Sequence, residues 1–121
     1  MTIREAIDRA NNLQFNTYTD AEKINWLSRL DERVALLVLD TGSADGQWYA
    51  KDVDTDTALL VPSPFDEMYI YWLMAQMSFA NGEIEKYNNA IALYNTEYEA
   101  YEKWYHRNRT IRPEKRGHWR M

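Results

Sequence analysis

Large apolar residues recur with helical spacing through the second half of the chain. From Ile84 to Tyr105 they follow one another at intervals of three and four residues, which aligns them along one stripe of a helix. The preceding stretch, Met68 to Ala75, is apolar on every side, so more than one neighbour has to cover it. Asn81-Gly82 lies between the two and is typical of a helix end. The pattern predicts an antiparallel helical hairpin, residues 64–80 and 83–108, that carries the core. The stripe consists of Ile84, Tyr87, Ile91, Tyr94, Tyr98, Tyr101 and Tyr105.

The first half carries two helix-start signals. Thr2 with Glu5 and Thr19 with Glu22 both have the spacing of a capping box. Periodic apolar residues follow each box, which predicts helices over residues 3–12 and 20–39. Ser63-Pro64 supplies an N-cap and a first-turn proline for the helix at 64–80.

These elements predict an all-α fold, a small bundle of about four helices with a C-terminal helical hairpin. A single helical domain is expected over residues 1–109, followed by a basic, mobile tail at 110–121. The turn-rich segment 41–62 is expected to be one long irregular loop that is mobile until a partner binds it. Only four Gly and three Pro occur, which argues against a turn-rich all-β fold, and without cysteine there is no disulfide or thiolate site.

The chain gives no sign of a leader peptide or a membrane segment. The opening stretch is charged and amphipathic, which predicts no signal peptide. The longest uncharged apolar run is far shorter than the roughly 20 residues that a membrane-spanning helix needs.

Charge is distributed unevenly along the chain, whose net charge is −5. From residue 103 onward seven Lys and Arg face one Glu, a net +6, whereas residues 1–102 hold seven basic and eighteen acidic residues, a net −11. An acidic body with a basic tail suits docking on an acidic protein surface, on a neighbouring copy or on nucleic acid. Nucleic acid would be bound without sequence specificity, through phosphates.

The stripe of aromatic residues also allows three interpretations. It suits a core within the chain or a contact between copies. A platform for nucleic-acid bases is the third, but the intervening residues are mainly Glu and Asn, which would repel phosphates.

One four-residue match points to an enzyme. Asp40-Thr41-Gly42-Ser43 reproduces the active-site signature of aspartic proteases, in which two copies pair their carboxylates. That family places its Asp after a β-strand, whereas residues 20–39 have helical spacing here. The protease remains a remote alternative, and Thr41-Gly42 is better explained as a helix end.

No metal or cofactor site is predicted. Asp52, Asp54 and Asp56 alternate like the start of a calcium loop, but Thr57 and Ser63 stand where that loop needs Gly and Glu. The two histidines, His106 and His118, have no partner at metal-ligand spacing. No catalytic constellation is apparent, and we expect a non-enzymatic protein.

Two motifs carry a family resemblance that covers about residues 1–105. They are D-x-D-T-x-L-L-V-P-x-P-x-D-E from Asp54 and N-G-E-x-x-K-Y-N-x-x-x-x-x-Y-N from Asn81, together with the opening MTIREAIDRANNL and the helix TDAEKINWLSRLDERV. With them the chain resembles the head–tail connector or adaptor proteins of tailed phages and prophages of Gram-positive bacteria. The basic tail at 107–121 matches that family least well.

The resemblance implies a virion structural protein of the phage neck, assembled in the host cytoplasm. It implies a homo-oligomeric ring that docks below the portal protein, extends the DNA channel and offers a surface to a downstream neck or tail protein. DNA would pass without sequence-specific binding, and no membrane, cofactor or small-molecule substrate is involved. The residues expected to bind partners are Asp52, Asp54 and Asp56 in the acidic loop and Arg107, Arg109, Arg112, Lys115, Arg116 and Trp119 in the basic tail.

Overall fold

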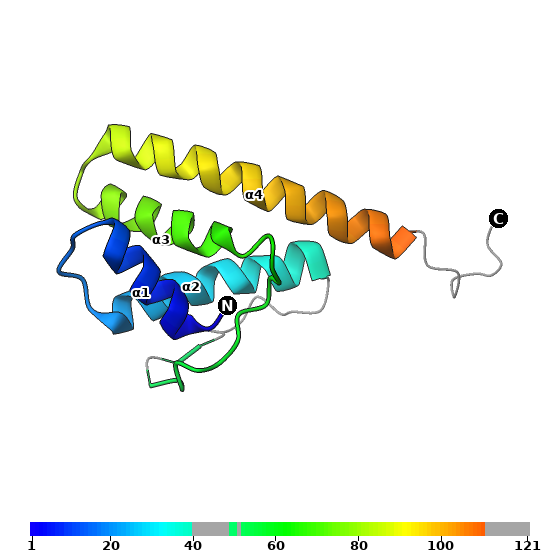
Figure 1. Cartoon of the computed structure of the whole chain (residues 1–121), viewed down its shortest axis with the longest axis horizontal. Coiled ribbons are helices and arrows are strands. Elements are labelled where there is room, and N and C mark those ends of the chain that lie inside the picture. The colour runs from blue at the N-terminus through cyan, green and yellow to red at the C-terminus, as the bar shows by residue number, and fades with distance from the viewer. Residues whose placement is uncertain (40–48, 51, 111–121) are drawn as a thin grey trace.

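The computed structural model describes residues 1–39, 49–50 and 52–110, and this part of the chain is helical (Figure 1). The predicted all-α fold is confirmed, and no β-strand occurs in the described ranges. No helix there is both long and apolar enough to cross a membrane. The elements in chain order are α1 (Ile3–Leu13), α2 (Asp20–Val34), the π-helical turn η1 (Ala35–Leu39), α3 (Glu67–Ala80) and α4 (Ile84–Thr110).

Both predicted capping boxes are formed. The Thr2 hydroxyl accepts from the Glu5 amide at 3.1 Å, and the Glu5 carboxylate accepts from the Thr2 amide at 2.8 Å. Thr19 and Glu22 make the same reciprocal pair at 3.1 and 3.0 Å. The boxes satisfy backbone donors that the first helical turn leaves without partners, which fixes where α1 and α2 begin.

Two helix boundaries differ from the expectation by more than two residues. The helix predicted over 20–39 is α-helical only to Val34 and ends in the wider η1 turn. The helix predicted from residue 64 begins at Glu67 instead. Pro62 to Asp66 form a separate turn, with the Phe65 amide bonded to the Pro62 carbonyl at 3.0 Å, and the Asp66 carboxylate lies 3.5 Å from the amino group of Met1. Tertiary contacts therefore displaced the local start signal.

α3 is the central element of the bundle. Figure 1 shows α4 along one side of α3, with α1 and α2 on the other. Its apolar side chains are covered by these neighbours, and Met68, Tyr69 and Leu73 are fully buried. The all-round apolar character of this helix is thus explained within one chain, and it gives no separate argument for a second copy.

The predicted hairpin of α3 and α4 is confirmed, and residues of the stripe on α4 share one core with residues of α3. Tyr94 and Tyr101 are buried, and Ile91, Tyr98 and Tyr105 pack against the core. Tyr87 lies outside this core and pairs with the exposed Phe79, with ring centroids 5.5 Å apart. Ile84 departs from the prediction, because 57% of its side chain is exposed at the start of α4. The connecting turn uses Gly82 at a φ of +75°, a backbone region that favours glycine.

Candidate partner-binding surfaces

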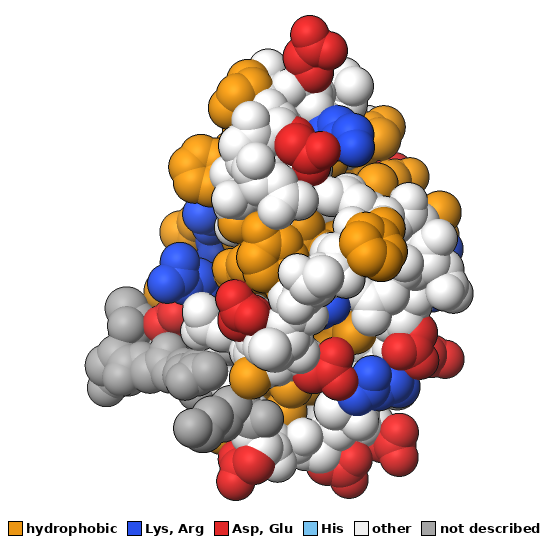
Figure 2. All heavy atoms as spheres, turned by 90° about the vertical axis from the view of Figure 1, so that its left-hand side faces the viewer, with side chains coloured by type: hydrophobic (Ala, Val, Ile, Leu, Met, Phe, Trp, Pro, Cys, Tyr) orange, Lys and Arg blue, Asp and Glu red, His pale blue; other side chains and the backbone are white. Residues whose placement is uncertain are grey.

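An apolar groove opens at the end of the bundle where α1 stops and the α3–α4 turn lies. Its volume is about 630 Å³. Figure 2 looks onto this end and shows apolar side chains reaching the surface among acidic ones. An exposed apolar surface with polar neighbours is typical of a protein-binding site. The groove is lined by Leu13, Gln14, Phe15, Met74, Asn81, Glu83, Lys86, Asn89, Ala90 and Leu93.

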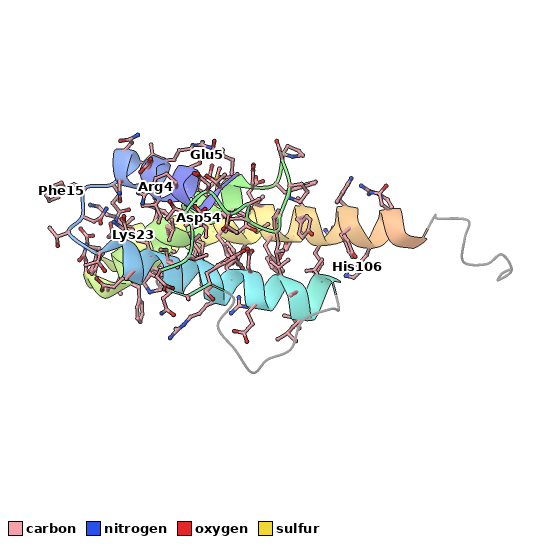
Figure 3. The ribbon with its side chains drawn as sticks, turned by 90° about the horizontal axis from the view of Figure 1, so that it is seen from below. Arg4, Glu5, Phe15, Lys23, Asp54 and His106 are labelled. Atoms are coloured by element: carbon pink, nitrogen blue, oxygen red, sulfur yellow. The ribbon has the colours of Figure 1, made fainter. Side chains whose placement is uncertain are left out.

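Phe15 is the most exposed large apolar side chain among the described residues, at 89%. It lies in the connection between α1 and α2 and projects away from the bundle (Figure 3). Hydrogen bonds hold this connection in place: Asn16 donates to the Gln14 carbonyl at 3.0 Å and accepts from the Tyr18 amide at 3.2 Å. The Tyr18 hydroxyl also bonds Asn81 at 2.6 Å. The exposure of Phe15 therefore belongs to an ordered turn.

The rim of the groove is polar and charged. The Lys86 ammonium lies 3.1 Å from the Glu83 carboxylate, and the Asn81 amide donates to the same carboxylate at 3.2 Å. These two bonds hold the pKa of Glu83 below its usual value, with Lys86 contributing most. The carboxylate therefore stays ionised and leaves a negative group at the groove edge.

A second feature is a buried carboxylate, Asp31 on α2, whose exposed fraction is 0%. It accepts hydrogen bonds from the Tyr49 hydroxyl at 2.5 Å, the Tyr69 hydroxyl at 2.6 Å and the Leu60 amide at 3.1 Å. Tyr69 in turn accepts from the Val61 amide at 2.8 Å. One carboxylate thus joins α2, α3 and the segment that precedes α3.

Burial dominates the electrostatics of this cluster. It raises the pKa of Asp31, because the charged form loses water, and the three hydrogen bonds oppose that rise. Burial also raises the pKa of both Tyr49 and Tyr69, and the neighbouring Asp31 charge adds to the effect. Both tyrosines therefore remain donors to Asp31. With its oxygens occupied inside the protein, Asp31 is a structural group.

The segment expected to be a mobile loop is attached to the bundle over the described part of its length, residues 49–50 and 52–62. Backbone amides of Ile3 and Arg4 donate to the carbonyls of Thr57 and Thr55 at 3.0 and 2.9 Å. Val61 is fully buried. The segment is irregular, as predicted, and its second half packs along α1 and into the core. The mobility expected for 41–62 in the free protein stays a prediction, which hydrogen exchange would test.

The three aspartates of this segment lie on its outer side. Asp52, Asp54 and Asp56 are all exposed. Asp54 accepts a hydrogen bond from the Asp56 amide at 2.9 Å, which stabilises the turn. Figure 3 shows Asp54 on the irregular segment that runs beside α1. No group of three or more His, Asp and Glu in the described part could hold a metal ion. The structure places the aspartates together as a solvent-facing acidic surface.

The predicted partner-binding basic residues that the structure describes lie at the other end of α4 from the groove. Arg107 is exposed near the end of α4, and Arg109 belongs to the same helix. Just before them, the Trp104 ring packs 5.4 Å from Phe65 between ring centroids and remains 37% exposed. The other predicted tail residues, Arg112, Lys115, Arg116 and Trp119, lie outside the described residues.

The aspartic-protease signature, Asp40 to Ser43, also lies outside the described residues. The chain that leads into it is helical up to Leu39. This is the helical context expected from the sequence, and it differs from the β-strand that the protease family needs. His106 stacks edge-on against Tyr105, with ring centroids 5.8 Å apart, and contributes to no metal cluster in the described ranges.

The groove and the Asp31 cluster were not anticipated from the sequence. A signal for Asp31 exists, because it follows Leu27 by four residues and precedes Val34 by three, on the buried face of α2. The groove has a weaker signal, the unpaired apolar residues Leu13 and Phe15 beside a helix end. Its other walls come from α3 and α4, distant in sequence.

Comparisons with known protein families, with curated proteins and with solved structures found no match to this chain. Its function is therefore argued from the motifs of the sequence and from the surfaces described above.

Proposed function

We propose that this chain is a structural protein of a tailed-phage neck, a head–tail connector that assembles into a ring below the portal and extends the DNA channel. The proposal begins from the resemblance carried by the motifs at Asp54 and Asn81. It assigns the protein no chemical reaction. Its partners are the portal protein, further copies of the chain and a downstream neck or tail protein.

One structural observation supports the proposal most: the protomer has two chemically different ends. An apolar groove lies at the start of α4, and basic residues gather at the other end of that helix. Figure 1 shows α4 continuing past the rest of the bundle. Unlike ends favour a head-to-tail contact, in which one face of a copy meets the opposite face of the next. Such contacts close into rings when the rotation between copies is suitable.

The acidic surface suits the same role. Asp52, Asp54 and Asp56 face solvent, and residues 1–102 carry a net charge of −11. A ring whose lumen bears such a surface repels the DNA phosphates, so that DNA slides through without being held.

The proposal expects a portal gene upstream of the gene for this chain, and it is tested by producing the chain together with that portal protein. Electron microscopy of the purified complex is expected to show a ring of this protein stacked coaxially on the portal ring. A chain that neither binds that portal protein nor forms rings on it would overturn the proposal. The chain without portal protein is the reference, and its own oligomeric state does not decide this test.

The basic C-terminal region supports a second candidate, a packaging accessory that binds DNA without sequence specificity. The net charge of +6 from residue 103 onward is the observation in its favour. A gel shift with random-sequence duplex DNA, at low and high salt, separates the two. Tight, salt-sensitive binding that disappears in an Arg112→Glu, Lys115→Glu, Arg116→Glu variant favours the accessory; absence of binding favours the connector.

A further inference from the structure

We propose that the groove between α1 and the α3–α4 turn receives the C-terminal segment, residues 111–121, of a second copy of this chain. The inference rests on the proposed function, since it names the contact that links neighbouring copies in the ring. It is supported by the chemistry of the groove, by charge and by the reach of the chain.

The groove combines an apolar floor with a hydrogen-bonding rim. Ala90 is buried at its base, Met74 is half-buried, and Leu93 is 49% exposed. Amide groups of Gln14 and Asn89 and the Glu83 carboxylate lie around them. Such a surface suits a peptide that brings one large aromatic side chain flanked by basic groups. Within residues 111–121 Trp119 is the only aromatic residue apart from His118, and Arg120 follows it.

Charge favours the same pairing. Stretches 13–23 and 79–93, which surround the groove, contain four acidic and two basic residues, a net charge of −2. One base, Lys23, is turned inward and donates to the Tyr18 carbonyl at 2.9 Å, and the other, Lys86, is paired with Glu83. Residues 111–121 contain four basic residues and one acidic residue, a net charge of +3. The rim therefore attracts the segment.

The reach of the chain selects a second copy over the same copy. Ala90 and Thr110 lie twenty residues apart on α4, about 30 Å at the helical rise. Trp119 is nine residues beyond Thr110, and a fully extended chain of that length spans at most about 30 Å. To reach the groove of its own copy, the segment would have to be fully extended, with no length left to place the Trp119 side chain among the lining residues. The groove of a neighbouring copy imposes no such limit. With the unlike ends of the protomer, a contact to a second copy is heterologous and propagates from copy to copy, whereas reciprocal exchange would give closed dimers only and no ladder.

Disulfide trapping in the full-length chain tests the inference, because the natural sequence has no cysteine. The double variant Asn89→Cys with Arg120→Cys places one thiol on the groove rim and one beside Trp119. Mild oxidation is expected to give a ladder of covalently linked copies. If only monomers with an internal disulfide formed, the contact would lie within one chain and the inference would be overturned. The absence of any disulfide would overturn it as well.

A matched pair replaces Asn89→Cys by Asp56→Cys, which puts the first thiol on the exposed acidic surface instead. The inference expects a much weaker ladder from this pair. Equal or stronger linkage through residue 56 would mean that the basic segment follows charge alone, and would overturn the role of the groove.

A second variant tests the role of the groove without introducing cysteine. Leu93→Lys adds a positive charge among the apolar lining residues, and Leu37→Lys adds the same charge at an η1 position that is 61% exposed. Light scattering of the complex with the portal protein is expected to show loss of ring closure for Leu93→Lys and an intact ring for Leu37→Lys. If both rings form and the ladder is absent, the inference fails while the connector function stands; if neither the natural chain nor the variants bind the portal protein, the function itself fails.

Discussion

Asp31 and Phe15 depart from the usual division between polar and apolar positions in opposite directions. Asp31 is a carboxylate with 0% exposure, and Phe15 is an aromatic side chain with 89% exposure. They lie in the same small bundle, on α2 and on the connection that leads into it. Either feature alone would suggest a functional site.

Their surroundings show why the two differ in meaning. Every donor near Asp31 comes from the chain itself, so the carboxylate is satisfied and holds three segments together. The turn around Phe15 is equally well hydrogen-bonded, yet the ring covers nothing and is covered by nothing beyond the groove it borders. A buried polar group with all partners supplied is structural. An apolar group held in the open by an ordered turn indicates a binding surface.

The largest effect is expected from Asp31→Ala. The change leaves two tyrosine hydroxyls and the Leu60 amide without an acceptor in the interior, and it should lower the free energy of unfolding by at least about 3 kcal/mol. Urea denaturation measures the loss. Asp52→Ala, at an exposed position, is the control and should change stability by no more than about 0.5 kcal/mol. Equal stability of the two variants would remove Asp31 from its structural role.

Ile91→Asp tests the hairpin, whose stripe packs against α3. Ile91 is partly buried against the core, so a carboxylate there should cost about 2 kcal/mol. Ile84→Asp makes the same change on the same helix at a position that is 57% exposed, with an expected cost below about 0.5 kcal/mol. Thermal melts followed by circular dichroism compare them, and a larger loss for Ile84→Asp would contradict the observed register.

Two buried tyrosine hydroxyls, one with a hydrogen-bond partner and one without a partner among the described residues, allow the stabilisation from such a bond to be measured. Tyr49→Phe removes one hydrogen bond to the buried Asp31 and should cost about 1.5 kcal/mol. In Tyr98 the hydroxyl is buried with no hydrogen-bond partner in the described part of the chain, so Tyr98→Phe should cost nothing or add stability. Denaturant midpoints are the measurement. Hydrogen exchange should also show faster opening of residues 52–62 in Tyr49→Phe alone.

Stability should depend on pH through Asp31. Burial raises its pKa in the folded chain above the ordinary value of 3.8, so the folded state binds this proton more tightly than the unfolded state. The resulting contribution is complete below about pH 3.8 and is lost as pH rises through the folded pKa. Glu22 and Glu83 have lowered pKa values and act in the opposite sense, so the useful quantity is the difference between natural chain and Asp31→Asn. This difference should change with pH above about 4, and a constant difference would contradict it.

The smallest effect on folding is expected from Phe15→Ser. Because the ring is 89% exposed, its loss should change the free energy of unfolding by less than about 0.5 kcal/mol. In the proposed head-to-tail contact, the change should nevertheless weaken association between copies, measured by sedimentation velocity at several concentrations. Leu37→Ser, at an exposed leucine on η1, is the control and should leave association unchanged. A clear loss of stability in Phe15→Ser would show that the turn depends on the ring.

The helices were predictable because their signals are local. Capping boxes and apolar periodicity depend on residues within a few positions of one another, and both boxes formed where expected. The start of α3 was missed because Asp66 faces Met1, a partner 65 residues earlier in the chain. That contact, with the preceding turn, outweighs the Ser63-Pro64 signal.

The binding surfaces were only partly predictable, for a related reason. Exposed aspartates at 52, 54 and 56 follow from their chemistry, since isolated carboxylates stay in water. The groove needs the end of α1, the middle of α3 and the start of α4 to meet, which no short window of sequence records. The charge of Asp31 would place it at the surface, and its burial could not be predicted because its three hydrogen-bond donors lie 18 to 38 positions away in the sequence.

The row of rings along the hairpin gives this protein an optical property. Tyr94 lies 5.1 Å from Trp72, and Tyr101 lies 6.2 Å from Trp104, between ring centroids. At such separations an excited tyrosine transfers its excitation energy to the neighbouring tryptophan. Tyr94 and Tyr101 should therefore fluoresce weakly in the folded chain. Tyr101 and Trp104 both belong to α4, so parting α4 from α3 separates only Tyr94 from Trp72, and the emission of Tyr94 should then rise. The natural chain thus carries its own reporter for opening of the hairpin, readable without an added dye.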